Sequence, residues 1–144
     1  MKTEPKILLI EDNEGDAELT IEALKNSSTP VEIIVINNGE DALKYLKPTK
    51  NFTHEELPDL IILDINLPKL DGKEILHFVK NDISLKRIPV VMLTTSSLQK
   101  DIIYSYDNHA NCYIVKPGNL REFISAIKSI ENFWTKCVTY PKTN

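Results

Sequence analysis

Cysteine, glycine, basic clusters and long apolar runs are scarce or missing in this chain of 144 residues. Its only cysteines, Cys112 and Cys137, form no CxxC pair and do not stand at zinc-ligand spacing from the histidines, which argues against a disulfide framework and a zinc site. No glycine-rich loop follows the first apolar segment, which argues against a nucleotide-binding site. Without a membrane-length apolar stretch or a signal peptide's apolar core, the chain is expected to be cytoplasmic.

The charge balance is mildly acidic. The sequence has 17 Lys and Arg residues against 21 Asp and Glu residues, for a net charge of -4, and contains no basic run or basic–aromatic patch. We therefore expect no binding to nucleic acid or to a membrane. The length fits one domain, which we place at residues 1–144 with a core from about residue 6 to residue 134.

Five apolar segments alternate with segments of helical spacing. The strands are expected at Ile7–Ile10, Val31–Ile36, Leu60–Leu63, Val90–Leu93 and Tyr113–Val115. Continuous apolar runs are typical of parallel strands covered on both faces, and Glu32 indicates an edge position for the second strand. Strict strand–helix alternation with short crossovers predicts an α/β fold, a doubly wound five-stranded parallel sheet with helices on both faces.

Polar groups follow four of these strands at the same end. Glu11 and Asp12 end the first apolar run, Asp64 ends the third, Thr94 follows the fourth and Lys116 follows the fifth. Ligands of open parallel sheets bind at the carboxyl ends of the strands. Three acids, a hydroxyl and an ammonium group at one edge predict a site for a divalent cation and a phosphoryl group. Taken singly, each residue also has an ordinary structural role, such as a strand threonine or a solvated lysine.

These motifs resemble the receiver domain of bacterial two-component response regulators. The residues that carry the resemblance are Glu11-Asp12, Leu63-Asp64-Ile65-Asn66-Leu67-Pro68 with Asp71-Gly72, Thr94, and Lys116-Pro117. The resemblance covers the chain from about Lys6 to Phe133 and implies a flavodoxin-like sheet of strand order 2-1-3-4-5. Further segments are similar to stand-alone receivers of the phytochrome-associated class, namely Glu11 to Asp16, Asp64 to Lys69, Asn111 to Tyr113 and Glu131 to Trp134.

The resemblance implies a mechanism centred on Asp64, the expected phosphoacceptor. Its carboxylate would attack the phosphorus of a phosphohistidine on a sensor histidine kinase, such as a phytochrome-type kinase. Mg²⁺ would be bound directly by Asp12 and Asp64, largely through water by Glu11, and by the backbone carbonyl of Asn66. The chain would not be an enzyme in the ordinary sense, because it would catalyse only its own phosphorylation and dephosphorylation.

The remaining expected residues serve charge and signalling. Lys116 would supply positive charge opposite the metal, and the Thr94 hydroxyl would hydrogen-bond a phosphoryl oxygen. A cis bond before Pro117 would aim the ammonium group inward. Tyr113 matches the family's switch aromatic and would turn inward when Thr94 moves. The switched surface is expected to be the face of the fourth helix, fifth strand and fifth helix, used for a homodimer, with no attached output domain.

Two other functions remain open. A pseudo-receiver would be a binding module that signals without phosphate, although such proteins usually lack one of the acids or the lysine. A metal-dependent phosphohydrolase also uses a strand-end aspartate. However, Asn66 stands where haloacid-dehalogenase-type enzymes need a second aspartate, and this length leaves no room for a cap domain. Turnover of a generic phosphate ester would favour the phosphohydrolase.

Overall fold

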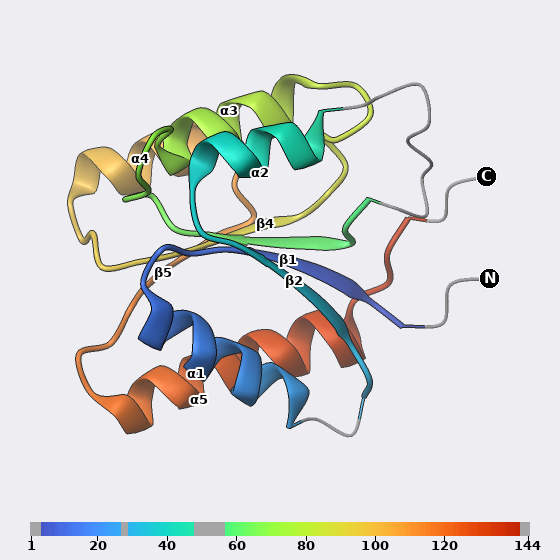
Figure 1. The fold of residues 1–144 in the computed structure, drawn as a ribbon, viewed down its shortest axis with the longest axis vertical. Coiled ribbons are helices and arrows are strands. Elements are labelled where there is room, and N and C mark those ends of the chain that lie inside the picture. Colours follow the sequence, from blue (N-terminus) through green and yellow to red (C-terminus); the bar gives the residue numbers. More distant parts are fainter. Residues whose placement is uncertain (1–3, 27–28, 48–56, 142–144) are drawn as a thin grey trace.

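The computed structural model describes residues 4–26, 29–47 and 57–141, and within them five parallel strands form one sheet. The strand order is β2-β1-β3-β4-β5, which confirms the predicted order (Figure 1). The strands are β1 (Lys6–Ile10), β2 (Glu32–Ile36), β3 (Leu60–Leu63), β4 (Val90–Thr94) and β5 (Cys112–Val115). Glu32 is exposed on the edge strand β2, as its charge predicted.

Helices cover both faces of the sheet (Figure 1). One face carries α1 (Glu14–Lys25) and α5 (Leu120–Glu131); the other carries α2 (Gly39–Leu46), α3 (Gly72–Asn81) and α4 (Gln99–Asp107). After α5 the chain continues as a short π-helix, η2 (Asn132–Cys137). Within the described ranges, every helix is too short or too polar to cross a membrane.

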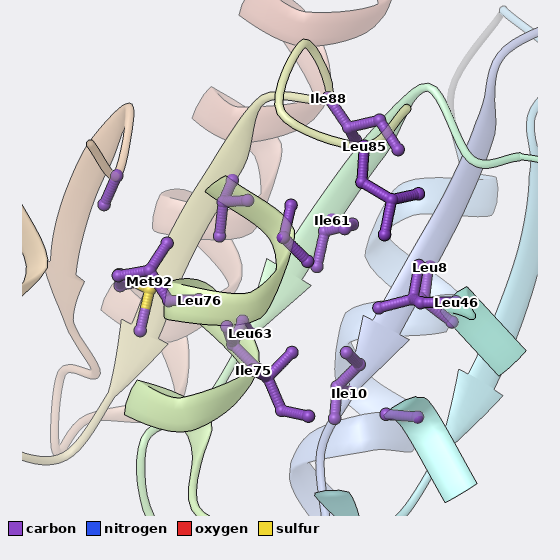
Figure 2. Close-up of a cluster of buried hydrophobic side chains, with 14 of the residues drawn as sticks. Leu8, Ile10, Leu46, Ile61, Leu63, Ile75, Leu76, Leu85, Ile88 and Met92 are labelled. Atoms are coloured by element: carbon purple, nitrogen blue, oxygen red, sulfur yellow. The ribbon is translucent and has the colours of Figure 1, made fainter. Parts of the chain in front are cut away.

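The apolar runs are continuous because consecutive strand residues enter two different cores. Leu8 and Ile10 point toward α2 and α3, where they join a cluster that includes Ile61 and Leu63 (Figure 2). The residues between them, such as Leu9, point to the opposite face and pack with α1 and α5. Both sets are almost completely buried. At roughly 25 cal/mol per Å² of apolar surface, this two-sided burial is the main stabilising contribution to the sheet.

Side chains that accept backbone hydrogen bonds begin the helices nearest the site. Asn13 caps α1 by accepting from the backbone N–H of Asp16, and Asp71 caps α3 by accepting from that of Lys73. Asp71-Gly72 thus forms the start of α3. The connection from residue 47 to residue 58 is polar in sequence, which is typical of a surface loop, and most of it, residues 48–56, lies outside the described residues.

Gly72 sets how closely α3 approaches the end of β3. A Cβ atom on Gly72 would lie 2.0 Å from the backbone oxygen of Asp64 and 2.8 Å from the Cα of Ile65. No larger residue fits there unless the backbone moves. The absence of a side chain thus lets the start of α3 lie directly against the segment that carries Asp64.

Candidate functional site

The register of the two central strands brings Glu11 and Asp64 side by side. Ile10 of β1 pairs with Leu63 of β3, so the next residue of each strand lies at the same edge. The backbone N–H of Asp64 donates to the carbonyl of Ile10 at 3.1 Å, which fixes this alignment. Glu11 and Asp64 are both buried although both carry carboxylates. Burial of two acids at one edge requires compensating positive charge.

Three carboxylates converge at this edge of the sheet. One oxygen atom from each of Glu11, Asp12 and Asp64 can be chosen so that all three atoms lie within 4.8 Å of one another. Asp12 is exposed, so the cluster is open on one side. Oxygen donors that keep access to water suit a hard cation such as Mg²⁺, which retains several waters when bound. The donor set therefore fits the expected metal.

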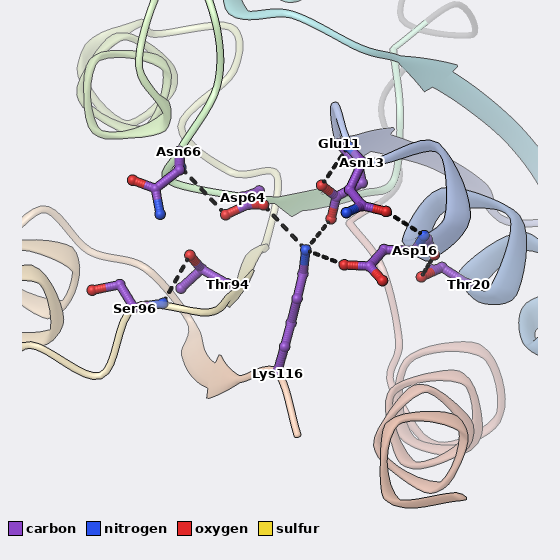
Figure 3. Close-up of polar contacts among 9 residues, drawn as sticks. All are labelled: Glu11, Asn13, Asp16, Thr20, Asp64, Asn66, Thr94, Ser96 and Lys116. Carbon is purple, nitrogen blue, oxygen red and sulfur yellow. Dashed lines mark hydrogen bonds and ion pairs between the residues drawn. The ribbon is translucent and has the colours of Figure 1, made fainter. Parts of the chain in front are cut away.

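Lys116 supplies the compensating charge within the protein. Its Nζ atom lies 2.6 Å from Oε1 of Glu11, 2.9 Å from Oδ2 of Asp16 and 3.2 Å from Oδ2 of Asp64 (Figure 3). The backbone N–H of Lys116 donates to the carbonyl of Thr94 at 2.7 Å, which places the lysine at the end of β5 beside β4. An ammonium group has three N–H donors, and three carboxylates surround this one.

Burial and neighbouring charge act on both members of the Glu11–Lys116 pair. Burial raises the pKa of Glu11 to about 7; the Lys116 hydrogen bond opposes this rise and the charge of Asp64 adds to it. For Lys116, burial alone would lower the pKa, but hydrogen bonds to Glu11 and Asp16 and the charge of Asp64 raise it above its ordinary value. Lys116 therefore stays charged, whereas the Glu11 carboxylate takes up a proton near neutral pH.

The expected cis bond before Pro117 is wrong: among the described residues no peptide bond is cis, so Lys116 and Pro117 are joined by a trans bond. A cis bond is not needed to aim the ammonium group inward. With the trans bond, the Lys116 backbone is held by Thr94 and its side chain already reaches Glu11 and Asp64.

Thr94 lies at the end of β4, and its side chain is completely buried. Its Oγ1 atom accepts a long hydrogen bond, 3.4 Å, from the backbone N–H of Ser96. Tyr113 on β5 contacts the same segment, because its hydroxyl donates to the carbonyl oxygen of Ser96 at 2.8 Å. Thr94 and Tyr113 are thus linked through one residue of the loop that follows β4.

The Ser96 side chain extends this connection to the helices. Ser96 and Gln99 stand at the spacing of a capping box, but Leu98 is the N-cap of α4 and has no side-chain hydrogen bond. Instead, the Ser96 hydroxyl donates to Asp101, which also forms an ion pair with Lys73 of α3. Hydrogen bonds from Lys73 and then Ser96 lower the pKa of Asp101. The ion pair of Lys73 and Asp101 therefore connects α3 to α4, and Ser96 connects it to the loop after β4.

Asn66 and Asp71 occupy different places relative to Asp64. The backbone N–H of Asn66 donates to Oδ1 of Asp64 at 3.3 Å, so the loop after β3 folds back over the carboxylate (Figure 3). Asp71 instead caps α3 and is exposed.

Sequence reasoning missed Asp16 and Asp101. Asp16 lies in the first turn of α1, where acids are common because they complement the helix dipole. Its contact with Lys116 joins residues 100 positions apart in the sequence. Asp101 likewise lies in the first turn of α4. Acids at helix starts therefore gave no specific signal for either contact.

The chain is similar to known proteins over most of its length. Residues 7–128 match the family described as the response regulator receiver domain. Response regulator Rcp1 of Synechocystis sp. is 44% identical over 135 residues, which cover 94% of this chain and 92% of Rcp1. The crystal structure of the phosphorylated cyanobacterial phytochrome response regulator RcpA is 46% identical with a TM-score of 0.91, covering 97% of this chain and 100% of RcpA. The Mn²⁺-bound form of Rcp1 is 42% identical with a TM-score of 0.88, covering 96% and 99%.

Proposed function

Because this chain belongs to the response regulator receiver domain family, we propose that it accepts a phosphoryl group on Asp64 from the phosphohistidine of a sensor kinase. The observation that carries the proposal is the contact of 3.2 Å between Nζ of Lys116 and Oδ2 of Asp64, inside a cluster of three carboxylates. A buried carboxylate with an ammonium group at one oxygen and acidic neighbours suits both metal binding and phosphoryl transfer.

In the proposed reaction an oxygen of Asp64 forms a bond to phosphorus while the bond from phosphorus to the kinase imidazole breaks. The imidazole keeps the bonding electron pair and takes up a proton from solvent water, so that it leaves as neutral imidazole. Lys116 stays charged, and its Nζ atom, which lies 3.2 Å from Oδ2 of Asp64, would reach an oxygen of the transferred group. The Thr94 hydroxyl would donate a hydrogen bond to another of these oxygens. These donors would meet negative charge where it develops, which is the main source of catalysis in phosphoryl transfer.

Asp12 and Asp64 would hold Mg²⁺ directly, Glu11 would hold it through water, and the backbone carbonyl of Asn66 would complete the protein ligands. The bound metal would supply the positive charge that offsets repulsion between the attacking carboxylate and the anionic phosphoryl group. The Mn²⁺-bound form of the similar protein Rcp1 supports a metal in this role. Both oxygens of Glu11 already have partners in the protein. Oε1 lies 2.6 Å from Nζ of Lys116, and Oε2 accepts a hydrogen bond from the backbone N–H of Asn13 at 3.1 Å.

The test is intact mass after incubation with Mg²⁺ and acetyl phosphate. We expect wild type to gain one phosphoryl group, and Asp64→Asn or wild type with a chelator to gain none. Asp107→Asn is a matched control, because Asp107 is an exposed aspartate at the end of α4, and it should behave as wild type. If wild type gains no phosphoryl group, a binding-only module becomes the better proposal. If it turns over a generic phosphate ester instead, a phosphohydrolase does.

We propose that phosphorylation changes the surface formed by α4, β5 and α5, and that this surface then binds a second copy of the chain. Exposed apolar side chains belong to this region, namely Leu98, Ile103, Tyr106, Val115, Leu120 and Phe133. Ile103 and Tyr106 lie three residues apart on α4 and so share one side of the helix. Apolar side chains exposed along one face favour a protein partner over open solvent. The similarity to RcpA supports a phytochrome-type kinase as the donor.

Sedimentation with and without phosphodonor tests the dimer. We expect phosphorylation to increase the dimer fraction of wild type, and Ile103→Glu to abolish the increase while still accepting phosphate. Ile83→Glu is the control, because Ile83 is an even more exposed isoleucine in the segment between α3 and β4. Equal dimer fractions for the two variants would show that the α4 side of this face is not the interface.

A further inference from the structure

The Lys116 ammonium group forms ion pairs with three acids, and the one with Asp16 has no role in the mechanism above. The Asp16 distance, 2.9 Å, is shorter than the Asp64 distance of 3.2 Å. The Asp16 side chain is 28% exposed, whereas those of Glu11 and Asp64 are 2% and 7% exposed. Asp16 is therefore the most accessible of the three partners, and it reaches the buried ammonium group from α1 (Figure 3).

The backbone of α1 holds Asp16 in this position. Its N–H donates to the Asn13 side chain at 2.9 Å, and its carbonyl accepts from the hydroxyl of the buried Thr20 at 2.7 Å. Because the first turn is fixed at both groups, few side-chain torsions separate the carboxylate from Lys116. The contact follows from the helix start as well as from the attraction between the two charges.

A simpler account is that Asp16 only complements the dipole of α1. Glu14 provides a comparison, because it lies in the same first turn and carries the same charge. Glu14 is exposed, and the described part of the chain offers it no ion pair with Lys116, which is surrounded by Glu11, Asp16 and Asp64. The helix-dipole effect is common to both acids, whereas the contact with the site belongs to Asp16 alone.

We propose that Asp16 is a positioning residue that competes with a phosphoryl group on Asp64 for the Lys116 ammonium group. The inference rests on the proposed function. An ammonium group has three donors, and all three have carboxylate partners before phosphorylation. A phosphoryl group adds negative charge at Asp64 and needs one of these donors. Asp16 opposes this twice, by holding the ammonium group toward α1 and by adding a negative charge near the incoming group.

The competition sets how strongly the site binds a phosphoryl group. Replacing Asp16 with asparagine keeps a side-chain oxygen but removes the charge, so the Lys116 ammonium group is freer to turn toward Asp64. If the Asp16 charge lies about 5 Å from the phosphoryl group in a solvent-exposed setting, its removal should change the affinity for that group by roughly three- to tenfold. Asp16→Glu restores the charge on a longer side chain and should return the affinity toward that of wild type.

Beryllium fluoride, a non-hydrolysing mimic of a phosphoryl group on a carboxylate, tests this without competing hydrolysis. Its dissociation constant is measured by calorimetry at saturating Mg²⁺ for wild type, Asp16→Asn, Asp16→Glu and the control Glu14→Gln. We expect Asp16→Asn to bind the mimic three- to tenfold more tightly and Glu14→Gln to bind as wild type. The difference should shrink at high ionic strength, since Asp16 is partly exposed and its charge is screened.

The outcomes separate the two proposals. If wild type binds the mimic and Asp16→Asn binds it equally or more weakly, Asp16 does not compete for Lys116, and the proposed function is unaffected. Equal gains in Asp16→Asn and Glu14→Gln would assign the effect to the general charge of the α1 start and would also overturn the inference. If wild type does not bind the mimic although Mg²⁺ is saturating, the proposed function fails and this inference fails with it. Thermal melts of each variant establish that all four proteins are folded.

Discussion

The hydroxyl of Tyr113 donates a hydrogen bond of 2.8 Å to the backbone carbonyl of Ser96, which ties β5 to the loop after β4. The backbone N–H of the same serine donates to Thr94, and its hydroxyl donates to Asp101. One loop residue therefore joins the buried threonine of the site to β5 and α4. A movement of Thr94 toward a phosphoryl group would have to lengthen or break these contacts. The hydrogen bond between Tyr113 and Ser96 therefore defines the unphosphorylated state, from which Tyr113 would turn inward.

Tyr113→Phe tests whether the hydrogen bond between Tyr113 and Ser96 is lost when the site binds a phosphoryl group. The variant lacks the hydrogen bond to Ser96, so its unphosphorylated form should be less stable by roughly 1 kcal/mol. If Tyr113 leaves Ser96 when Thr94 moves, the loss should disappear in the presence of Mg²⁺ and beryllium fluoride. Urea unfolding of both proteins in the two conditions measures this. Tyr106→Phe, an exposed tyrosine of α4, is the control. An equal loss in both conditions would mean that Tyr113 keeps its bond and is not the switch.

Asp64→Asn should stabilise the metal-free fold. Asp64 is buried within 4.8 Å of the other two carboxylates, and Lys116 keeps Glu11 and Asp16 as partners when the charge of Asp64 is removed. Relief of repulsion at about this distance contributes roughly 1 kcal/mol or somewhat more, less the lost contact with Lys116. Mg²⁺ should then stabilise wild type more than the variant. Thermal melts with and without Mg²⁺ decide the point, and an equal metal response in both proteins would show that Asp64 is not a metal ligand.

The pH dependence of the metal-free protein should report on Glu11. Its pKa is raised from 4.5 to about 7, so the folded state holds this proton more tightly than the unfolded state. The stabilisation is fully present below pH 4.5 and is lost as pH rises through 7, by at most about 3 kcal/mol. Glu11→Gln should not show this loss, whereas Glu14→Gln should retain it. Urea unfolding at several pH values measures the effect, and a loss of equal size in Glu11→Gln would assign it to another group.

The sequence predicted the sheet because its evidence was local and redundant. Leu60–Leu63 is apolar at every position, which is typical of a short strand buried on both faces, and its alternation with helical segments supports the same interpretation. The same regularity placed Glu11 and Asp64 at one edge. The contacts that escaped prediction depend on the geometry of side chains far apart in the sequence, as with Asp16 and Lys116. The bond before Pro117 was predicted cis from resemblance alone, and the structure has it trans.

Gly72→Ala should be among the most destabilising single substitutions outside the core. Its new Cβ would meet the backbone oxygen of Asp64 at 2.0 Å, so the start of α3 and the end of β3 must separate. A shift of this kind costs on the order of 1–3 kcal/mol and displaces the acceptor carboxylate, so phosphorylation by acetyl phosphate should slow as well. Gly118→Ala is the matched control, because nothing lies within 4 Å of its added Cβ. Urea unfolding and phosphorylation rates are compared in both variants. A stable Gly72→Ala protein with a normal rate would mean that α3 does not position Asp64.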